Sequence, residues 1–397
     1  MTNHSAQLMK VLFYASTFGA DLLAFAQYLD KIPDVSIKVL LSDPEKFQNE
    51  GIAKLIPLKA ELIKKSLKNY FFKPGDFKPD VTIMDNKVPL RAPSPNGFML
   101  WHGFGWKGPN DVPEFRWLHN SIKAAWGSAM EPNPNFRWQC FGEWDFKHRT
   151  DISGFHPDNC RILGAASHDV LRDPFPKEKM QPFYPFDVVN RKTILIAPTW
   201  HYGEVFSHWG TDRELFEKLL NRIDKHDANV ILRLHDSFRF DSTYIAFLEE
   251  LVDNHPNTLL KFKDQNPDNL LDIMVSDALI TNYSSIANLF YATGRPTIHV
   301  YPVKSKDEDF QWRKHTAFGT RKKTLNSVKY IWKLSPEENG GLIAMDFDML
   351  LEQVDEVLNN PDCCKEKAQD FLDEYMLGAD GKNCQRIWEA VQEQVKG

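Results

Sequence analysis

The chemistry in this sequence is clearest in a short turn, Asn282-Tyr283-Ser284-Ser285, which follows the apolar run from Ala278 to Thr281. A stretch with helical spacing, Ile286 to Thr293, comes next, and Gly294 stands where a helix-ending glycine belongs. Two hydroxyls and several unpaired backbone N–H groups would therefore meet at a helix start, where the helix dipole adds positive charge. Such a site binds phosphate without a metal. Serines also cap helices without any further role, so the turn alone leaves both interpretations open.

A histidine in a loop with spaced glycines is the second candidate. His102 follows the predicted strand Gly97 to Leu100, and its loop continues through Gly103, Phe104, Gly105, Trp106, Lys107 and Gly108. Imidazole titrates near neutral pH, so this side chain is suited to act as a general base. The glycines would let a substrate approach the backbone closely. A structural histidine bonded to a loop carbonyl is the alternative that the residues leave open.

Polar residues also follow two later strands. The predicted strand Thr193 to Ala197 leads into Pro198-Thr199-Trp200-His201-Tyr202-Gly203, and the strand Val230 to Leu234 carries Arg233 and is followed by His235. In an open α/β sheet, ligands bind at the carboxyl ends of the strands. These two strand ends and the serine turn are therefore expected along one edge of a sheet.

Strands and helices alternate along the whole chain, which predicts parallel sheets covered by helices. The best linker is the stretch Asp173 to Pro185, which holds four prolines in thirteen residues. We therefore expect an N-terminal Rossmann-like acceptor domain over 1–175, a linker over 176–190, and a Rossmann-like donor domain over 191–360. C-terminal helices over 361–397 are expected to bridge the two domains.

Composition excludes several classes of protein. The net charge of −6 over 397 residues argues against general nucleic-acid binding. The five cysteines form no CxxC pair, which speaks against a disulfide framework or a zinc site. No GxGxxG follows the first strand, so a nicotinamide dinucleotide is not indicated. The acidic run 307–309 is read as solvated surface, and we predict neither a metal nor a cofactor.

The stretch from Leu55 to Lys78 is rich in lysines and in aromatic and aliphatic residues. A basic amphipathic segment of this kind can lie on an anionic membrane surface. An ordinary surface helix with a solvated lysine face is the alternative. No apolar run reaches the roughly 18 residues that a membrane span needs, and Met1 to Ser5 do not resemble a signal peptide.

Taken in order, these motifs resemble the CDP-glycerol glycerophosphotransferase family, the teichoic-acid polyol-phosphate primases and polymerases. The matching segments are Trp101-His102-Gly103 with Lys107, Ala197-Pro198-Thr199-Trp200, Arg233-Leu234-His235, Ser276 to Ser285, Arg295-Pro296 and Asp380-Gly381. Each match is weak by itself, but the ordered set is fairly specific.

The resemblance implies a GT-B fold and metal-independent transfer of glycerol phosphate from a CDP-linked donor, with release of CMP. It assigns His102 as the base, and it assigns His235, Ser284 and Ser285 to the donor diphosphate. We accordingly predict His102 and His235 as the catalytic residues. We extend the donor site to Arg233, Asn282, Thr199 and His201, and the acceptor loop to Gly103 and Lys107. The implied partners are CDP-glycerol or a related CDP-polyol and a glycan or lipid-linked acceptor. The implied location is the cytoplasm, with peripheral contact at the inner face of the membrane.

Several residues depart from the family pattern. His201 stands where an arginine is usual, Asn282 and Asn288 replace two aspartates, and Phe104-Gly105-Trp106 replaces Thr-Pro-Leu. Arg233 or Arg239 could supply the charge that His201 lacks. The departures leave open a nucleotide-sugar glycosyltransferase and a non-catalytic binder of polyol phosphates. UDP-sugar 2-epimerases share the broad architecture, but their carboxylate acid/base set is not evident here.

Overall fold

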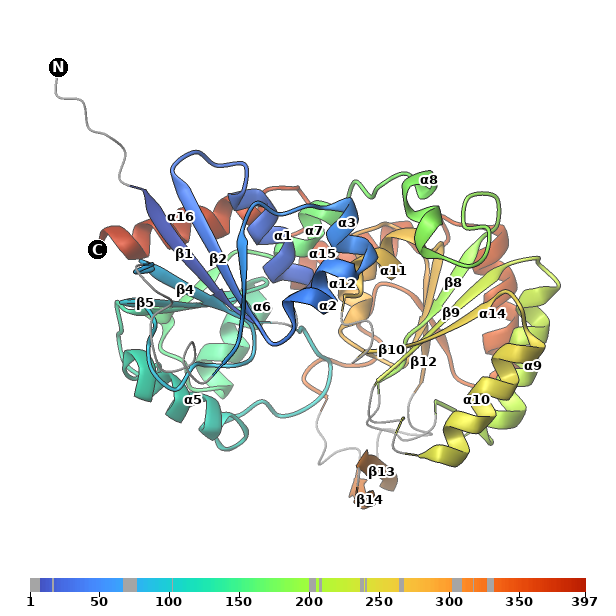
Figure 1. The fold of residues 1–397 in the computed structure, drawn as a ribbon. Coiled ribbons are helices and arrows are strands. Elements are labelled where there is room, and N and C mark those ends of the chain that lie inside the picture. Colours follow the sequence, from blue (N-terminus) through green and yellow to red (C-terminus); the bar gives the residue numbers. More distant parts are fainter. Residues whose placement is uncertain are drawn as a thin grey trace. The chain divides into compact units, whose positions relative to one another are not determined.

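The computed structural model describes residues 8–397 apart from 16–17, 67–76, 102, 200–204, 207–208, 236–238, 240, 264–267, 302–308, 317 and 327–331. The chain forms two compact units (Figure 1). Unit 1 comprises Met1–Phe104, Asn110–Arg172 and Asp373–Gly397, and unit 2 comprises Gly105–Pro109 and Asp173–Leu372. No helix in the described part of the chain is long and apolar enough to cross a membrane.

Unit 1 contains a seven-stranded sheet in the order β3-β2-β1-β4-β5-β6-β7, in which all neighbouring strands are parallel. The strands are β1 (Met9–Tyr14), β2 (Val35–Leu41), β3 (Glu61–Lys64), β4 (Val81–Met84), β5 (Asn96–Met99), β6 (Phe136–Cys140) and β7 (Cys160–Ile162). Most of β1 and all of β4 are buried, as expected of a parallel sheet that has helices on both faces.

The helices of unit 1 lie on both faces of its sheet (Figure 1). They are α1 (Ala20–Leu29), α2 (Pro44–Asn49), α3 (Gly51–Leu55), α5 (Val112–Trp126), α6 (Glu143–Lys147), α7 (Ala166–Leu171) and α16 (Asn383–Lys396). The last helix, α16, contacts α1, α7 and β5. Asp169 anchors it by accepting the backbone N–H groups of Asn383 at 3.1 Å and Cys384 at 2.7 Å. A carboxylate at a helix start is favourable, and the C-terminal helix packs as part of unit 1.

Unit 2 contains a six-stranded parallel sheet in the order β10-β9-β8-β11-β12-β15. The strands are β8 (Thr193–Ile196), β9 (Asn229–Leu234), β10 (Thr258–Phe262), β11 (Ala278–Thr281), β12 (Thr297–Val300) and β15 (Leu342–Ala344). The chain runs outward from β8 in one direction to β10 and then returns to β11 on the other side. The strand order therefore reverses between β8 and β11.

Helices α9 (Asp212–Asp224), α10 (Ser242–Asn254) and α14 (Phe347–Asn359) pack on one face of this sheet. Their buried side chains meet alternate strand residues such as Ile194, Ile196 and Ile280. Helices α11 (Leu270–Val275) and α12 (Ile286–Tyr291) contact strands β8, β11 and β12. Helix α15 (Lys365–Tyr375) follows α14.

The proline-rich segment after residue 173 is built into unit 2. It forms helix α8 (Lys177–Met180) and a single turn of 3-10 helix, Gln181–Phe183. Met180 and Val188 are fully buried, and Lys177 forms an ion pair with Asp277 at 2.6 Å. The segment therefore packs as part of a domain, although its composition suggested a linker.

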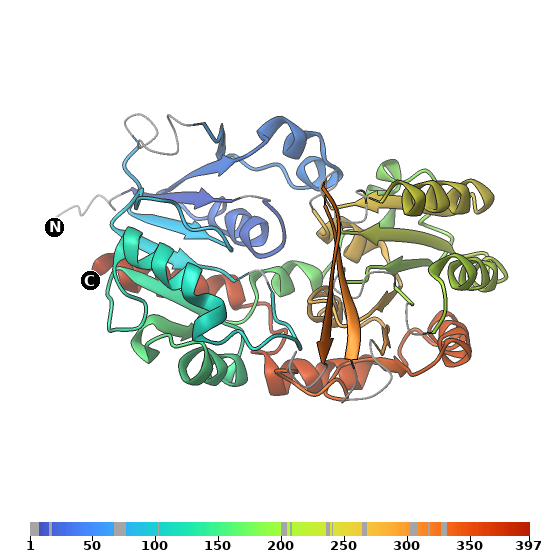
Figure 2. The same cartoon turned by 90° about the horizontal axis from the view of Figure 1, so that it is seen from below.

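Two stretches differ from their sequence-based interpretation. The charged region after residue 307, which shows no periodicity, contains the antiparallel hairpin β13 (Asp309–Thr316) and β14 (Gly319–Asn326), a separate ribbon in Figure 2. The lysine-rich stretch 55–78 does not form a long helix in its described part. It contains β3, which pairs with β2 at the edge of the sheet. Residues 67–76 of that stretch lie outside the described residues.

Candidate donor-binding site

The predicted strand ends of unit 2 lie next to one another. Strands β9, β8 and β11 are consecutive in the sheet, so His235, Thr199 and the serine turn follow three adjacent strands. The reversal of strand order falls between β8 and β11. In doubly wound sheets, this is the position where ligands bind.

Side chains of the turn join the ends of β8 and β11. The Asn282 Oδ1 accepts the backbone N–H of Thr199 at 2.6 Å. The Thr281 hydroxyl donates to the carbonyl of Ala197 at 2.8 Å. Asn282 is 1% exposed, and its Nδ2 has no hydrogen-bond partner among the described residues. The asparagine at 282 therefore keeps the acceptor oxygen of an aspartate and adds a buried N–H donor at the strand end.

Ser284 and Ser285 are half-buried at the start of α12. The Ser285 side chain makes no capping hydrogen bond. The backbone N–H of Ser284 donates to the Thr281 hydroxyl at 3.4 Å, and the carbonyls of Ser284 and Ser285 accept from Ala287 and Asn288 at 3.1 and 3.3 Å. Among the described residues, simple capping therefore does not account for the two hydroxyls.

Tyr283 has an unusual backbone conformation immediately before the serines. Its φ of +61° lies in the left-handed region, which a bulky residue adopts only under constraint. The ring is 1% exposed. It packs on His299 at 4.6 Å between ring centroids and against Trp106 at 5.6 Å and Trp332 at 5.5 Å.

Arg233 was predicted to hold the donor diphosphate, but its guanidinium is committed elsewhere. It is 7% exposed and pairs with Asp272 Oδ2 at 2.9 Å. Asp272 also accepts from Lys261 Nζ at 2.6 Å and from the Tyr184 hydroxyl at 2.7 Å. The geometry gives no support to a direct contact between Arg233 and the donor, and it assigns the guanidinium to the frame of unit 2.

The motif arginine Arg295 has a similar structural role. Its Nη1 donates to the carbonyls of Ile273, Met274 and Ser276 at the end of α11. Burial lowers the pKa of this guanidinium from its usual value. The arginine of the Arg-Pro pair that resembles the family motif thus holds the segment between α11 and β11 in place through hydrogen bonds.

The remaining predicted site residues are only partly described. His235 is half-buried directly after β9, Gly103 is half-buried, and Arg239 is exposed. His102 and His201 lie outside the described residues. The structure therefore brings together Thr199, His235, Asn282, Ser284 and Ser285 at the strand ends of unit 2.

Lys107 belongs to unit 2, where its backbone forms an antiparallel bridge with Trp332. Burial lowers the pKa of its ammonium to about 7. Because the folded pKa lies below the unfolded value, the unfolded chain binds more protons between pH 7 and about 10.4. Lys107 should therefore make the protein more stable as the pH rises through this window.

A Lys107→Met variant is expected to be more stable than the wild type at pH 7 and to lose this pH dependence, because it lacks the ammonium whose pKa is lowered by burial. Urea denaturation at pH 7, 8 and 9 measures the effect. The exposed Lys179 supplies the control, since Lys179→Met should leave stability within about 0.5 kcal/mol at each pH. Equal stability of Lys107→Met and wild type at pH 7 would contradict the burial of this ammonium.

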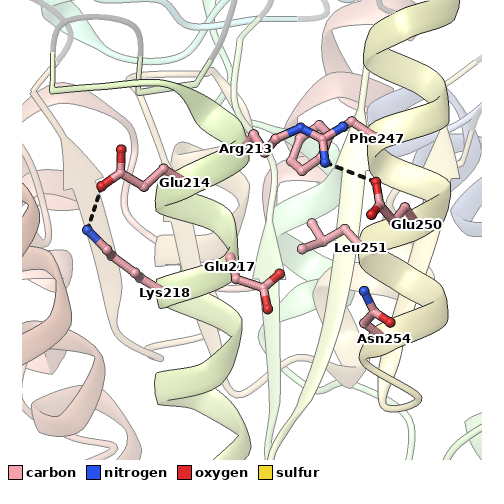
Figure 3. Close-up of a pocket in the computed structure, with 8 residues that line it drawn as sticks. All are labelled: Arg213, Glu214, Glu217, Lys218, Phe247, Glu250, Leu251 and Asn254. Atoms are coloured by element: carbon pink, nitrogen blue, oxygen red, sulfur yellow. Dashed lines mark hydrogen bonds and ion pairs between the residues drawn. The ribbon is translucent and has the colours of Figure 1, made fainter.

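A surface groove between α9 and α10 is a separate feature (Figure 3). It is lined by Arg213, Glu214, Glu217, Lys218, Phe247, Glu250, Leu251 and Asn254. Two ion pairs, Arg213 with Glu250 and Lys218 with Glu214, neutralise much of its charge. No residue of the groove comes from a strand end, so it does not belong to the candidate donor site.

Sequence reasoning missed three residues of this region. The sequence places Tyr283 in a turn and Trp106 in a loop with spaced glycines, and it gives no sign that His299 lies beside them. His299 is fully buried, burial lowers its pKa to about 3, and its Nε2 lies 2.5 Å from the Tyr291 hydroxyl. The only signal in the sequence was the density of aromatic residues, which does not indicate which rings meet.

The chain is similar in sequence to known proteins of teichoic acid synthesis. The family model described as CDP-Glycerol:Poly(glycerophosphate) glycerophosphotransferase matches residues 164–315. The teichoic acid ribitol-phosphate polymerase TarK of Staphylococcus aureus is 25% identical over 331 residues, which are 78% of this chain and 56% of TarK. TarL of the same organism is 25% identical over 62% of this chain and 39% of TarL. The chain therefore spans about half the length of the curated relatives that it matches, or less.

Solved structures agree with the predicted fold. The wall teichoic acid polymerase TagF superposes with a TM-score of 0.67 at 15% identity, covering 100% of this chain and 90% of TagF. UDP-GlcNAc 2-epimerase from Neisseria meningitidis superposes with a TM-score of 0.56 at 15% identity, covering 97% and 100% of the two chains. These similarities confirm two Rossmann-like domains of the GT-B type. By sequence, the chain is similar to the CDP-glycerol glycerophosphotransferase family over residues 164–315 and to the teichoic acid polymerases TarK and TarL.

Proposed function

We propose that this protein transfers a polyol phosphate, with glycerol phosphate the first candidate, from a CDP-linked donor to a hydroxyl acceptor of a cell-wall or capsule polymer, and that it releases CMP. The observation that carries the proposal is the serine turn at the strand-order reversal of unit 2, inside the region that matches the family model. TagF was solved after a soak with CDPG, and TarK is a ribitol-phosphate polymerase. Both relatives favour a CDP-polyol as the donor.

In the proposed reaction, the acceptor oxygen attacks the phosphorus that carries the polyol. The bond from this phosphorus to the bridging oxygen breaks, and CMP leaves with the bonding electrons. His102 takes the proton of the acceptor hydroxyl as the new phosphodiester forms. Ser284, Ser285 and the N–H groups of their turn hold the donor diphosphate, with His235 beside them. Arg233 is left out of this set because it is paired with Asp272.

Thr199 and Asn282 have a supporting role in this proposal. Their hydrogen bond fixes the end of β8 against the serine turn, so that donor groups from two strand ends are presented together. His201 is proposed to complete the donor side, and Gly103 and Lys107 the acceptor side. Neither a metal nor a cofactor is assigned to the reaction.

The proposed location follows from the acceptor. A lipid-linked or growing polymer would be met at the inner face of the cell membrane, and the lysines of residues 55–78 are the proposed contact with its anionic lipids. Sedimentation with anionic vesicles, before and after replacement of these lysines by glutamate, addresses this part of the proposal separately from catalysis.

The nucleotide product tests the proposed reaction. Incubation with CDP-glycerol or CDP-ribitol and an acceptor should release CMP, which chromatography detects. A nucleoside diphosphate released from a nucleotide sugar would instead indicate glycosyl transfer. Donor binding with no product from any donor would indicate a non-catalytic binding protein.

A Ser284→Ala/Ser285→Ala double variant should bind CDP at least tenfold more weakly by calorimetry, because hydrogen bonds to a charged group contribute about 1.5–3 kcal/mol each. Ser242, which is exposed at the start of α10, provides the control, and Ser242→Ala should retain wild-type affinity. Wild-type affinity in the double variant would remove the serine turn from the donor site.

A further inference from the structure

Residues Gly105–Pro109 belong to unit 2, although the chain on either side of them belongs to unit 1. Their backbone is paired with a later segment of unit 2. The carbonyl of Trp106 accepts the N–H groups of Lys333 at 2.5 Å and Leu334 at 3.4 Å, and Lys107 bridges Trp332. The short segment is therefore integrated into unit 2 and is more than a surface loop.

The side chain of Trp106 lies at the centre of an aromatic cluster. It is 0% exposed, and its Nε1–H donates to the Glu338 carbonyl at 2.8 Å. Its ring meets Tyr283 edge-on at 5.6 Å, His299 at 5.5 Å and Phe371 at 5.7 Å between centroids. The indole thus has both a fixed hydrogen bond and packing partners on several sides.

One of these partners is the strained residue of the turn. Tyr283 has a φ of +61°, and a conformation of this kind persists only where the surroundings determine it. The Tyr283 hydroxyl is buried and has no hydrogen-bond partner among the described residues. The packing of its ring, and not a bond to its hydroxyl, therefore holds Tyr283 in place, and Trp106 supplies one wall of that packing.

We propose that Trp106 is a positioning residue for the donor site: it packs against Tyr283, keeps the backbone of residue 283 in the left-handed conformation, and so directs Ser284 and Ser285 toward the donor diphosphate. The inference rests on the proposed function and adds to it a residue from a segment far away in the sequence. Loss of the indole would let Tyr283 relax toward an ordinary conformation, and the two serines would turn with it.

A Trp106 that only fills the core would behave differently. Its replacement would lower the free energy of unfolding, but every folded molecule would still bind CDP with wild-type affinity. The decisive measurement is therefore the CDP affinity of protein shown by circular dichroism to be folded at the temperature of the titration.

The test compares Trp106→Leu and Trp106→Phe with the control Phe216→Leu. Phe216 is fully buried in the α9 core of the same unit, where it packs against Phe206. Calorimetry should show CDP binding at least tenfold weaker in Trp106→Leu and about threefold weaker in Trp106→Phe, which keeps a ring in the cluster. Phe216→Leu should lose stability and keep its affinity within twofold.

The inference is overturned if folded Trp106→Leu binds CDP within twofold of wild type, or if Phe216→Leu weakens binding equally. If Trp106→Leu does not fold, Trp106→Phe replaces it, and CDP affinity within twofold of wild type in that variant would overturn the inference. Wild-type protein that binds CDP but releases no CMP from any donor would refute the proposed reaction and leave this inference standing. Wild-type protein that does not bind CDP would refute both.

Discussion

A His102→Ala variant is expected to bind CDP with wild-type affinity and to lose about 10²-fold or more of its turnover. The acceptor hydroxyl must give up its proton as it attacks phosphorus, and a positioned base contributes about 10²–10⁴-fold to such a step. Removal of the imidazole takes away this base, whereas the proposed diphosphate site lies on other residues. CMP release under saturating donor gives the turnover, and calorimetry with CDP gives the affinity.

The pH profile and a second histidine provide the controls. Wild-type turnover should fall as the pH drops below the range near 6.5 where imidazole becomes protonated, and His102→Ala should lack this decline. His156→Ala replaces a half-buried histidine of unit 1 that accepts the N–H of Asp158 at 3.2 Å, and it should keep normal turnover. Undiminished turnover in His102→Ala would exclude His102 as the base. If the variant instead lost CDP affinity together with turnover, His102 would be assigned to donor binding.

An Asp272→Asn variant is expected to lose about 3–5 kcal/mol of the free energy of unfolding. Asp272 is 1% exposed and meets Arg233, Lys261 and Tyr184. Replacement of the carboxylate removes the paired charge from the 7% exposed guanidinium of Arg233 and from Lys261, and breaking a buried ion pair in this way is strongly destabilising. Urea denaturation followed by circular dichroism measures the loss.

Asp355 provides a matched control because it pairs with Arg222 and His226 at the surface. Both members of the Asp355–Arg222 pair are about a third exposed, so Asp355→Asn should cost about 1 kcal/mol or less. Equal losses in the two variants would contradict the buried network.

Acid titration gives an independent readout of the same network. Burial alone would raise the pKa of Asp272, but Lys261 and Arg233 outweigh it and hold the pKa below its usual value. A depressed folded pKa contributes stability that is present above about pH 4 and is lost as the pH falls through the folded value. Asp272→Asn should therefore show a smaller loss of stability on acidification than the wild type.

Much of the fold could be predicted because the central strands are short, continuous apolar runs. The apolar run Ala278 to Thr281 forms β11 with the same bounds, and the predicted strands Thr193 to Ala197 and Val230 to Leu234 each differ from the observed strand by one residue at one end. Strand Phe136–Cys140 was missed because polar residues interrupt it. Gln139 is nonetheless fully buried. Its amide tolerates burial because its Nε2 donates a hydrogen bond to the carbonyl of Gly164. Such a partner 25 residues away leaves no local signal.

The same contrast holds for the candidate site. The grouping of Thr199, His235 and Ser284 was predictable because carboxyl ends of parallel strands meet at one edge of a sheet. The ion pair between Arg233 and Asp272 was not predictable, because Asp272 lies 39 residues further along the chain. The left-handed Tyr283 was equally hidden, since its conformation depends on packing against rings that only the folded chain brings together.

The two tryptophans on either side of His102 are anchored in different places. Trp101 packs against Trp138 at 5.0 Å in the core of unit 1, whereas Trp106 is buried in unit 2. Within five residues the chain therefore passes from a tryptophan buried in the core of unit 1 to a tryptophan buried in the core of unit 2. A substitution at Trp101 should therefore disturb the packing of unit 1, and a substitution at Trp106 the packing of unit 2.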